Sequence, residues 1–208
     1  MARLRGLAVD EVARVLYIAD TGNHAIRRVD LDTIALEVTT VAGSPIQVGF
    51  AGDDGPAVDA SLFAPEAVAV LPANGSLYIA DTANHRLRVV MPTGVISTIM
   101  GTGVPASGVS GPAARQLALD SPRGVATDTF GNVFVTSRRS IVRIDSGVDG
   151  IATGQDGAET IFGLLREGYP ENITDCLGGL AVADSSAGRQ DRVVAVDFCV
   201  GAAIELRR

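Results

Sequence analysis

A twelve-residue stretch occurs twice with few changes, first as Leu16-Tyr17-Ile18-Ala19-Asp20-Thr21-Gly22-Asn23-His24-Ala25-Ile26-Arg27 and 61 residues later as Leu77-Tyr78-Ile79-Ala80-Asp81-Thr82-Ala83-Asn84-His85-Arg86-Leu87-Arg88. Two weaker copies follow at further offsets of 56 and 60 residues: Val133 to Ser137 with Ile141 to Ile144, and Val193 to Asp197 with Ala203 to Leu206. Self-similarity of this kind indicates an array of similar structural units.

Two further motifs recur with the same period. A run of small and branched residues precedes each copy: Gly6 to Asp10, Ala67 to Val70, Gly124 to Asp128, and Gly179 to Asp184. A third run follows the first two copies: Val38 to Gly43 and Val95 to Gly101. Each unit is therefore three or four short β-branched runs separated by Gly, Pro, Asn and Asp, which predicts strands and turns.

The order of residue sizes predicts how these strands are arranged. The small residues of the first run suit an innermost strand crowded around an axis, and the larger residues of the second run suit the wider space outside it. One four-stranded sheet cannot bury both of its faces, so several sheets must pack radially. The sequence therefore predicts an all-β fold, a β-propeller of four-stranded antiparallel blades.

The turn sequences Asp20 to Arg27 and Asp81 to Arg88 resemble the NHL repeat, which is named for Asn-His-Leu. The linker from Gly49 to Ala57, followed by Leu62 to Pro65, resembles the long-loop bacterial variety of that family. The resemblance implies a propeller, commonly six-bladed. It does not imply one particular function.

We expect a single propeller or partial propeller with units at approximately 1–62, 63–120, 121–175 and 176–208. These make about four blades, the last of which lacks its outer strand. An incomplete ring leaves an apolar blade face open. Three arrangements would cover it: a longer chain supplying the remaining blades, a closed four-bladed ring, or a homo-oligomer.

Composition excludes several classes of function. The net charge of −7 argues against a nucleic-acid partner, which needs a basic face. No apolar run is long enough for a membrane span. All 17 positive side chains are Arg, so a Schiff-base lysine and a Walker-type phosphate loop are excluded.

The repeated turn carries both histidines of the chain. We expect a structural role, in which Asp and Thr cap the turn, Asn adopts a left-handed conformation and His hydrogen-bonds locally. A metal centre is the competing interpretation, but two His and two Cys offer few of the usual ligands. The residues concerned are Asp20, Asn23, His24, Asp81, Asn84 and His85.

Cys176 and Cys199 flank the fourth copy at what should be the same end of its blade. A disulfide between them is compatible with antiparallel strands, and two buried free thiols are the equal alternative. A disulfide would indicate an extracellular or periplasmic location, and free thiols a cytoplasmic one.

The residues next to the inner strands provide the candidate binding site: Arg5, Glu66 and Arg123, with Gly178 at the fourth position. In a propeller these positions ring one mouth of the central channel. Two arginines and a glutamate there suit a small anion or an acidic peptide tail. A solvated rim without a ligand is the competing interpretation.

The sequence favours a non-catalytic propeller that serves as a protein-interaction or scaffold module without a cofactor, because it shows no nucleophile–base pair and no cofactor loop. The alternative is a lactonase-like hydrolase or a lyase with a divalent metal, such as Ca²⁺, at the channel. Asp53, Asp54 and Asp59 lack the spacing of a calcium loop, so we expect a solvated turn there.

Overall fold

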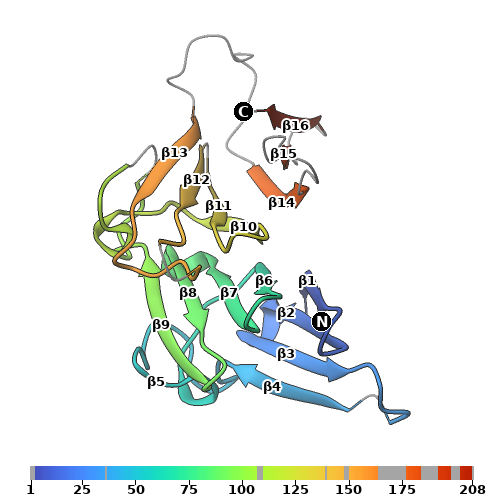
Figure 1. The fold of residues 1–208 in the computed structure, drawn as a ribbon. Coiled ribbons are helices and arrows are strands. Elements are labelled where there is room, and N and C mark those ends of the chain that lie inside the picture. Colours follow the sequence, from blue (N-terminus) through green and yellow to red (C-terminus); the bar gives the residue numbers. More distant parts are fainter. Residues whose placement is uncertain are drawn as a thin grey trace.

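The computed structural model describes residues 3–35, 37–106, 110–138, 140–147, 150–163, 177–183, 192–197 and 202–207. They form four antiparallel sheets whose innermost strands β1, β6, β10 and β14 are neighbours in turn, with β4, β9 and β13 farthest from them (Figure 1). The first sheet has the order β1 (Leu4–Asp10), β2 (Val15–Asp20), β3 (Ala25–Asp30) and β4 (Val38–Ala42).

The next three sheets repeat this meander. The second contains β6 (Ala67–Leu71), β7 (Ser76–Asp81), β8 (Arg86–Val90) and β9 (Val95–Met100). The third contains β10 (Pro122–Thr127), β11 (Val133–Ser137), β12 (Ser140–Ile144) and β13 (Ala158–Gly163). The fourth contains β14 (Leu177–Ala183), β15 (Arg192–Asp197) and β16 (Ala202–Arg207). The expected propeller of four-stranded blades, with a fourth blade of three described strands, is confirmed.

The described segments between these strands include four short 3-10 helices: η1 (Thr21–Asn23), η2 (Ala57–Asp59), η3 (Thr82–Asn84) and η4 (Ala114–Gln116). Within the described residues, no helix has the length and apolar character needed to cross a membrane. Cys176 and Cys199 lie outside the described residues, so the disulfide stays a prediction.

The linker between the first two blades does more than connect them. Its residues Gly55–Pro56 form a short strand, β5, that pairs with β9 as a fifth strand of the second sheet. The expected boundary at residue 62 therefore places β5 in the first unit, although β5 pairs with a strand of the second blade. Pro56 occupies a position where proline is tolerated, because β5 is at the edge of the sheet.

Alternation of side chains along the strands gives each blade two different faces. One face pairs an alanine of the inner strand with an aromatic residue of the second strand: Ala8 lies opposite Tyr17, and Ala69 lies opposite Tyr78. The other face carries branched residues, such as Val68 opposite Ile79 in the second blade.

These unlike faces meet between successive blades and form three apolar clusters. The first cluster joins Ala19 and Ile26 of blade 1 to Val68 and Ile79 of blade 2. The second packs Tyr78 of blade 2 against branched residues of blade 3, and the third packs Phe134 of blade 3 against Val193 and Ala195 of blade 4. The core therefore lies between blades, so no blade can bury its faces alone.

Gly43 and Gly101 directly follow the outer strands β4 and β9 and lie against the turns that contain His24 and His85. Gly43 and Gly101 have φ values of 85° and 100°. A Cβ atom on Gly101 would lie 2.2 Å from the carbonyl oxygen of His85, and one on Gly43 would lie 2.3 Å from that of His24. These positions require glycine for both its backbone conformation and its lack of a side chain.

Replacing Gly101 by Ala should therefore lower the free energy of unfolding by about 3 kcal/mol, because strain and a backbone clash add together. Gly94→Ala is the matched control, since Gly94 has a φ of 81° but no atom within 4 Å of its Cβ position. That variant should lose only about 1 kcal/mol. Urea denaturation followed by circular dichroism measures both, and equal losses would contradict the close approach at His85.

Candidate functional site

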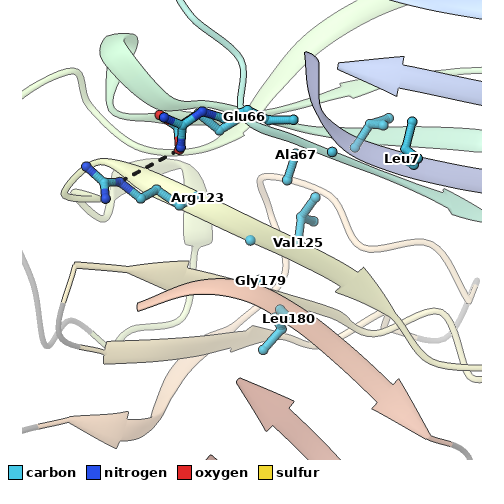
Figure 2. A pocket seen from close by; sticks show the side chains of 11 residues that line it. Leu7, Glu66, Ala67, Arg123, Val125, Gly179 and Leu180 are labelled. Carbon is cyan, nitrogen blue, oxygen red and sulfur yellow. Dashed lines mark hydrogen bonds and ion pairs between the residues drawn. The ribbon is translucent and has the colours of Figure 1, made fainter. Parts of the chain in front are cut away.

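The inner strands of all four blades line one central hollow with a volume of about 400 Å³. Residues near the start of β1, β10 and β14 contribute to it, together with Glu66 at the entrance to β6 (Figure 2). Each blade supplies equivalent positions because the repeat places its inner strand at the axis. The hollow is thus the place where the four units converge.

The structure brings together the three charged residues of the predicted channel mouth. Arg5 Nη1 donates a hydrogen bond to Glu66 Oε2 at 2.9 Å, and Arg123 Nε lies 3.8 Å from the same oxygen. Figure 2 shows Arg123 and Glu66 directed toward each other at the pocket. The side chains of Arg5 and Arg123 are 39% and 38% exposed, whereas that of Glu66 is 14% exposed.

This arrangement leaves a local excess of one positive charge. A guanidinium group has five N–H donors, and each arginine uses one nitrogen in the described contact with Glu66. Glu66 holds the two guanidinium groups near each other but neutralises only one of them. Exposed ion pairs of this kind stabilise a fold by less than about 1 kcal/mol, so this cluster is not needed to hold the blades together.

The histidine turns differ from the expected geometry in two ways. The left-handed residues are His24 and His85, with φ values of 55° and 52°; Asn23 and Asn84 instead belong to η1 and η3. The asparagines stay in the helical turn because Nδ2 of each one donates to a carboxylate oxygen of the aspartate three residues earlier.

The histidines also bond across blades rather than locally. Nδ1 of His24 accepts a hydrogen bond from the Ala64 N–H at 3.0 Å, and Nδ1 of His85 accepts one from the Ser121 N–H at 3.1 Å. Ala64 and Ser121 both have positive φ, at 49° and 48°. Each histidine therefore satisfies an N–H group in a strained segment that leads into the next blade.

A threonine in each turn completes this connection. Thr21 Oγ1 donates to the carbonyl oxygen of Pro65 at 2.6 Å, and Thr82 Oγ1 donates to that of Pro122 at 2.6 Å. Pro65 immediately precedes Glu66, and Pro122 immediately precedes Arg123. The histidine–threonine pair of one blade thus positions the channel-mouth residue of the next.

Asp81 is the most deeply buried carboxyl of the turns. It accepts hydrogen bonds from the Phe63 N–H and from Asn84 Nδ2, both at 2.8 Å, and lies 3.5 Å from Arg88 Nη1. Burial raises the pKa of Asp81 to about 6, because removal from water opposes ionisation more strongly than these three donors favour it.

Arg88 is fully buried and has a second carboxylate partner, which the sequence analysis missed. Asp53 Oδ1 lies 2.8 Å from Arg88 Nη2, and Asp53 Oδ2 lies 3.8 Å from Arg115. The aspartate belongs to the linker where a solvated turn was expected, and the Phe50 ring of the same linker lies 5.0 Å from Arg88 Cζ. Asp53 and Asp81 together therefore neutralise the buried charge of Arg88.

A sequence signal for this contact exists. Arg88 aligns with Arg27, and strand alternation places it on the same face as Val90 and directly opposite Ile79, so it falls on the branched face of its blade. A buried arginine needs a carboxylate partner. The acidic linker is a candidate, but its approach to the second sheet depends on β5 and leaves no local sequence pattern.

The described part of the chain contains no group of three or more His, Cys, Asp or Glu side chains arranged to hold a metal ion. His24 and His85 contact different linkers rather than a shared point.

Comparison with known proteins places this geometry among propellers. A family model of the teneurin NHL domain matches residues 1–111. Human teneurin-4 is 41% identical over 85 residues, which make up 36% of this chain and 3% of teneurin-4. The chain therefore spans a small fraction of this relative. The relatives that match include human and mouse proteins, and the bacterial origin stays a prediction.

Two solved structures show the same fold at low sequence identity. A Bacteroides thetaiotaomicron protein of unknown function has a TM-score of 0.64 at 16% identity, over 98% of this chain and 46% of that one. A putative gluconolactonase has a TM-score of 0.58 at 15% identity, over 97% of this chain and 62% of that one. Both of these chains extend beyond the part that matches.

The raised pKa of Asp81 gives a pH dependence with a definite sign. Between about pH 4 and pH 6 the folded state retains a proton that the unfolded chain has released. The contribution of Asp81 to the free energy of unfolding is therefore fully present below pH 4 and decreases by about 3 kcal/mol as the pH rises through 6. Urea denaturation across pH 4 to 7 should show this decrease in the wild type and lose it in Asp81→Asn.

Asp20→Asn is the control, because Asp20 holds the equivalent position in the first blade, where it accepts from Asn23 and Arg27. This variant should retain the decrease seen in the wild type. A parallel pH profile of Asp81→Asn and the wild type would contradict the assignment.

Proposed function

Because the chain belongs to the teneurin NHL domain family, we propose that it is a non-catalytic protein-interaction module whose channel mouth binds a short acidic peptide segment. The observation that carries this proposal is the convergence of Arg5 and Arg123 on a single glutamate. Blades 1 and 3 supply the arginines and blade 2 supplies Glu66, so the site exists only when three blades pack together.

The chemistry of the mouth favours a carboxylate ligand. An incoming carboxylate can accept two parallel hydrogen bonds from one guanidinium group, a geometry that adds both affinity and orientation. Glu66 contacts both arginines and orders their side chains, which reduces the conformational entropy lost when a ligand binds. The excess positive charge favours a ligand with a negative charge.

The rest of the hollow favours an apolar residue next to that carboxylate. Leu7, Val68, Val125 and Leu180 also line it, one from each inner strand, and of these Leu7 and Leu180 keep exposed surface. An acidic residue followed by an apolar one would match this sequence of surfaces. The net charge of −7 on the whole chain repels a long acidic tract at a distance, so a short segment is preferred.

The enzymatic alternative has less support. Likeness to a putative gluconolactonase shows only the fold at 15% identity. Among the described residues that line the central hollow, Glu66 is the only carboxylate, and Arg5 and Arg123 both contact it. A metal-dependent site would instead need several convergent carboxylates. A thermal melt with Ca²⁺ and with EDTA tests this alternative: a clear shift between them would favour it.

Titration of a fluorescein-labelled pentaglutamate peptide tests the binding proposal. Arg5→Ala and Arg123→Ala should each lower affinity by about tenfold or more, because each removes a charge-assisted hydrogen-bond donor. Arg14→Ala is the matched control, since Arg14 is an exposed arginine paired with Asp32 at the opposite end of β1. Its affinity should equal that of the wild type.

A pentaglutamine peptide controls for the charge of the ligand and should bind weakly or not at all. Equal binding of both peptides would rule out carboxylate recognition. Wild-type affinity in both Arg5→Ala and Arg123→Ala would place any peptide site elsewhere.

A further inference from the structure

A second hollow adjoins the channel mouth at the third blade. It has a volume of about 260 Å³ and is lined by Asp120, Ser121, Arg123 and Arg138. Arg123 also lines the central hollow, so the two hollows meet at this side chain. Sites for whole small molecules commonly measure about 300–1,000 Å³, so the second hollow suits a single side chain of a larger ligand.

The segment that enters the third blade repeats the backbone of the segment that enters the second. Ala64 and Ser121 have nearly the same φ, at 49° and 48°, and each donates its N–H group to Nδ1 of a turn histidine. The residues before them, Phe63 and Asp120, each donate their N–H group at 2.8 Å to a side chain at the end of the second strand of the blade. The two segments thus share one arrangement of the backbone.

The side chains on this shared backbone differ in chemistry. Before β6, the rings of Phe63 and His24 pack edge to face with their centroids 5.5 Å apart, and Ala64 follows. Before β10, the corresponding residues are Asp120 and Ser121, and Ser121 Oγ donates to Asp120 Oδ1 at 3.0 Å. The fold does not require these polar side chains, because the second blade forms the same backbone with apolar ones. The polar hollow is therefore a feature of the third blade and not of the repeat.

The turn after β11 supplies an arginine to this hollow. In the first two blades, η1 or η3 and a histidine join the second strand to the third. In the third blade only two residues separate β11 from β12, and Arg138 is the first of them. Arg138 Nη1 donates to Asp120 Oδ2 at 3.2 Å. The shorter turn thus places a guanidinium group beside the carboxylate of Asp120.

The second hollow has the same arrangement of charge and exposure as the channel mouth. The side chain of Asp120 is 13% exposed, whereas those of Arg123 and Arg138 are 38% and 50% exposed. A ligand therefore reaches the guanidinium groups more readily than the carboxylate. Over both hollows, three arginines and two carboxylates leave an excess of one positive charge, because Arg5 and Glu66 complete the set. This surface favours an acidic ligand group at each hollow.

We propose that the second hollow binds a second acidic side chain of the peptide at the channel mouth, with Arg123 between the two carboxylates. The inference rests on the proposed function, because it concerns the same ligand. A guanidinium group has five N–H donors in a planar fork, so Arg123 can contact more than one carboxylate. Once the first acidic side chain is bound, the second binds intramolecularly, and affinity increases at little further entropic cost. The ligand is therefore a segment with at least two acidic residues.

Titration calorimetry with two peptides separates the two hollows. One peptide is pentaglutamate, and the other has one central glutamate between two glutamines on each side. Both are acetylated and amidated at their ends, so that side chains carry their only carboxylates. The titrations are run in 0.15 M NaCl, where exposed charges more than about 8 Å apart are largely screened from each other.

Arg138→Asn removes the guanidinium group and keeps a residue type that tolerates the φ of 42° at this position. This variant should bind pentaglutamate about fivefold more weakly than the wild type does, as expected for loss of a half-exposed ion pair. Its affinity for the single-glutamate peptide should be unchanged, because that peptide occupies only the channel mouth. Unchanged binding of this peptide also shows that the variant is folded.

Arg14→Asn is the matched control. Arg14 also has a positive φ, at 55°, its side chain is 57% exposed, and it pairs with Asp32 at 3.3 Å. The substitution therefore makes the same change in charge and in turn chemistry at a site away from both hollows. Its affinity for each peptide should equal that of the wild type.

The outcomes distinguish this inference from the proposed function. Wild-type affinity of Arg138→Asn for pentaglutamate, with a loss in Arg5→Ala for both peptides, would overturn the second hollow and retain the channel mouth. Equal losses of both peptides in Arg138→Asn would also overturn it, because Arg138 would then act on the single carboxylate at the mouth. Wild-type affinity of Arg5→Ala for both peptides would instead overturn the channel-mouth proposal and, with it, the pairing of the two hollows.

Discussion

Packing of an alanine–aromatic face against a branched face is the interaction on which the rest of the structure depends. Tyr78 and Phe134 are each almost fully buried at such a contact, although each belongs to a sheet with little core of its own. A buried aromatic side chain removes about 150–250 Å² from water, so each contact contributes several kcal/mol before the entropy of ordering is subtracted. The blades are therefore stable as a row, not as separate units.

The same packing makes the candidate site. Stacking brings the inner strands of successive blades side by side, and this places Arg5, Glu66 and Arg123 at one mouth. The hydrogen bonds from Thr21 and Thr82 hold the proline that precedes Glu66 or Arg123, so the turn of one blade aligns the charged residue of the next. The stability of the fold and the geometry of the candidate site thus depend on one set of contacts, and a change at a blade interface should affect both.

The repeat could be predicted from the sequence because its period and its alternation are local properties. Leu16 to Arg27 and its copy at Leu77 to Arg88 are sufficient to place the strands, and the equivalent positions of Arg5, Glu66 and Arg123 in their units indicate that these side chains meet. The partners of His24, His85 and Arg88 could not be predicted, because each lies on a linker about 35 to 40 residues away. Those contacts depend on where a loop without a periodic pattern crosses the next blade.

Within the described residues, each contact between successive blades pairs an alanine–aromatic face with a branched face. A nuclear Overhauser experiment on methyl-labelled chain measures this packing directly. We predict signals between the ring of Tyr78 in the second blade and the methyl groups of Val125, Val133 or Val135 in the third. Absence of these signals, with the Tyr78 ring in contact with water, would contradict the packing of blade on blade.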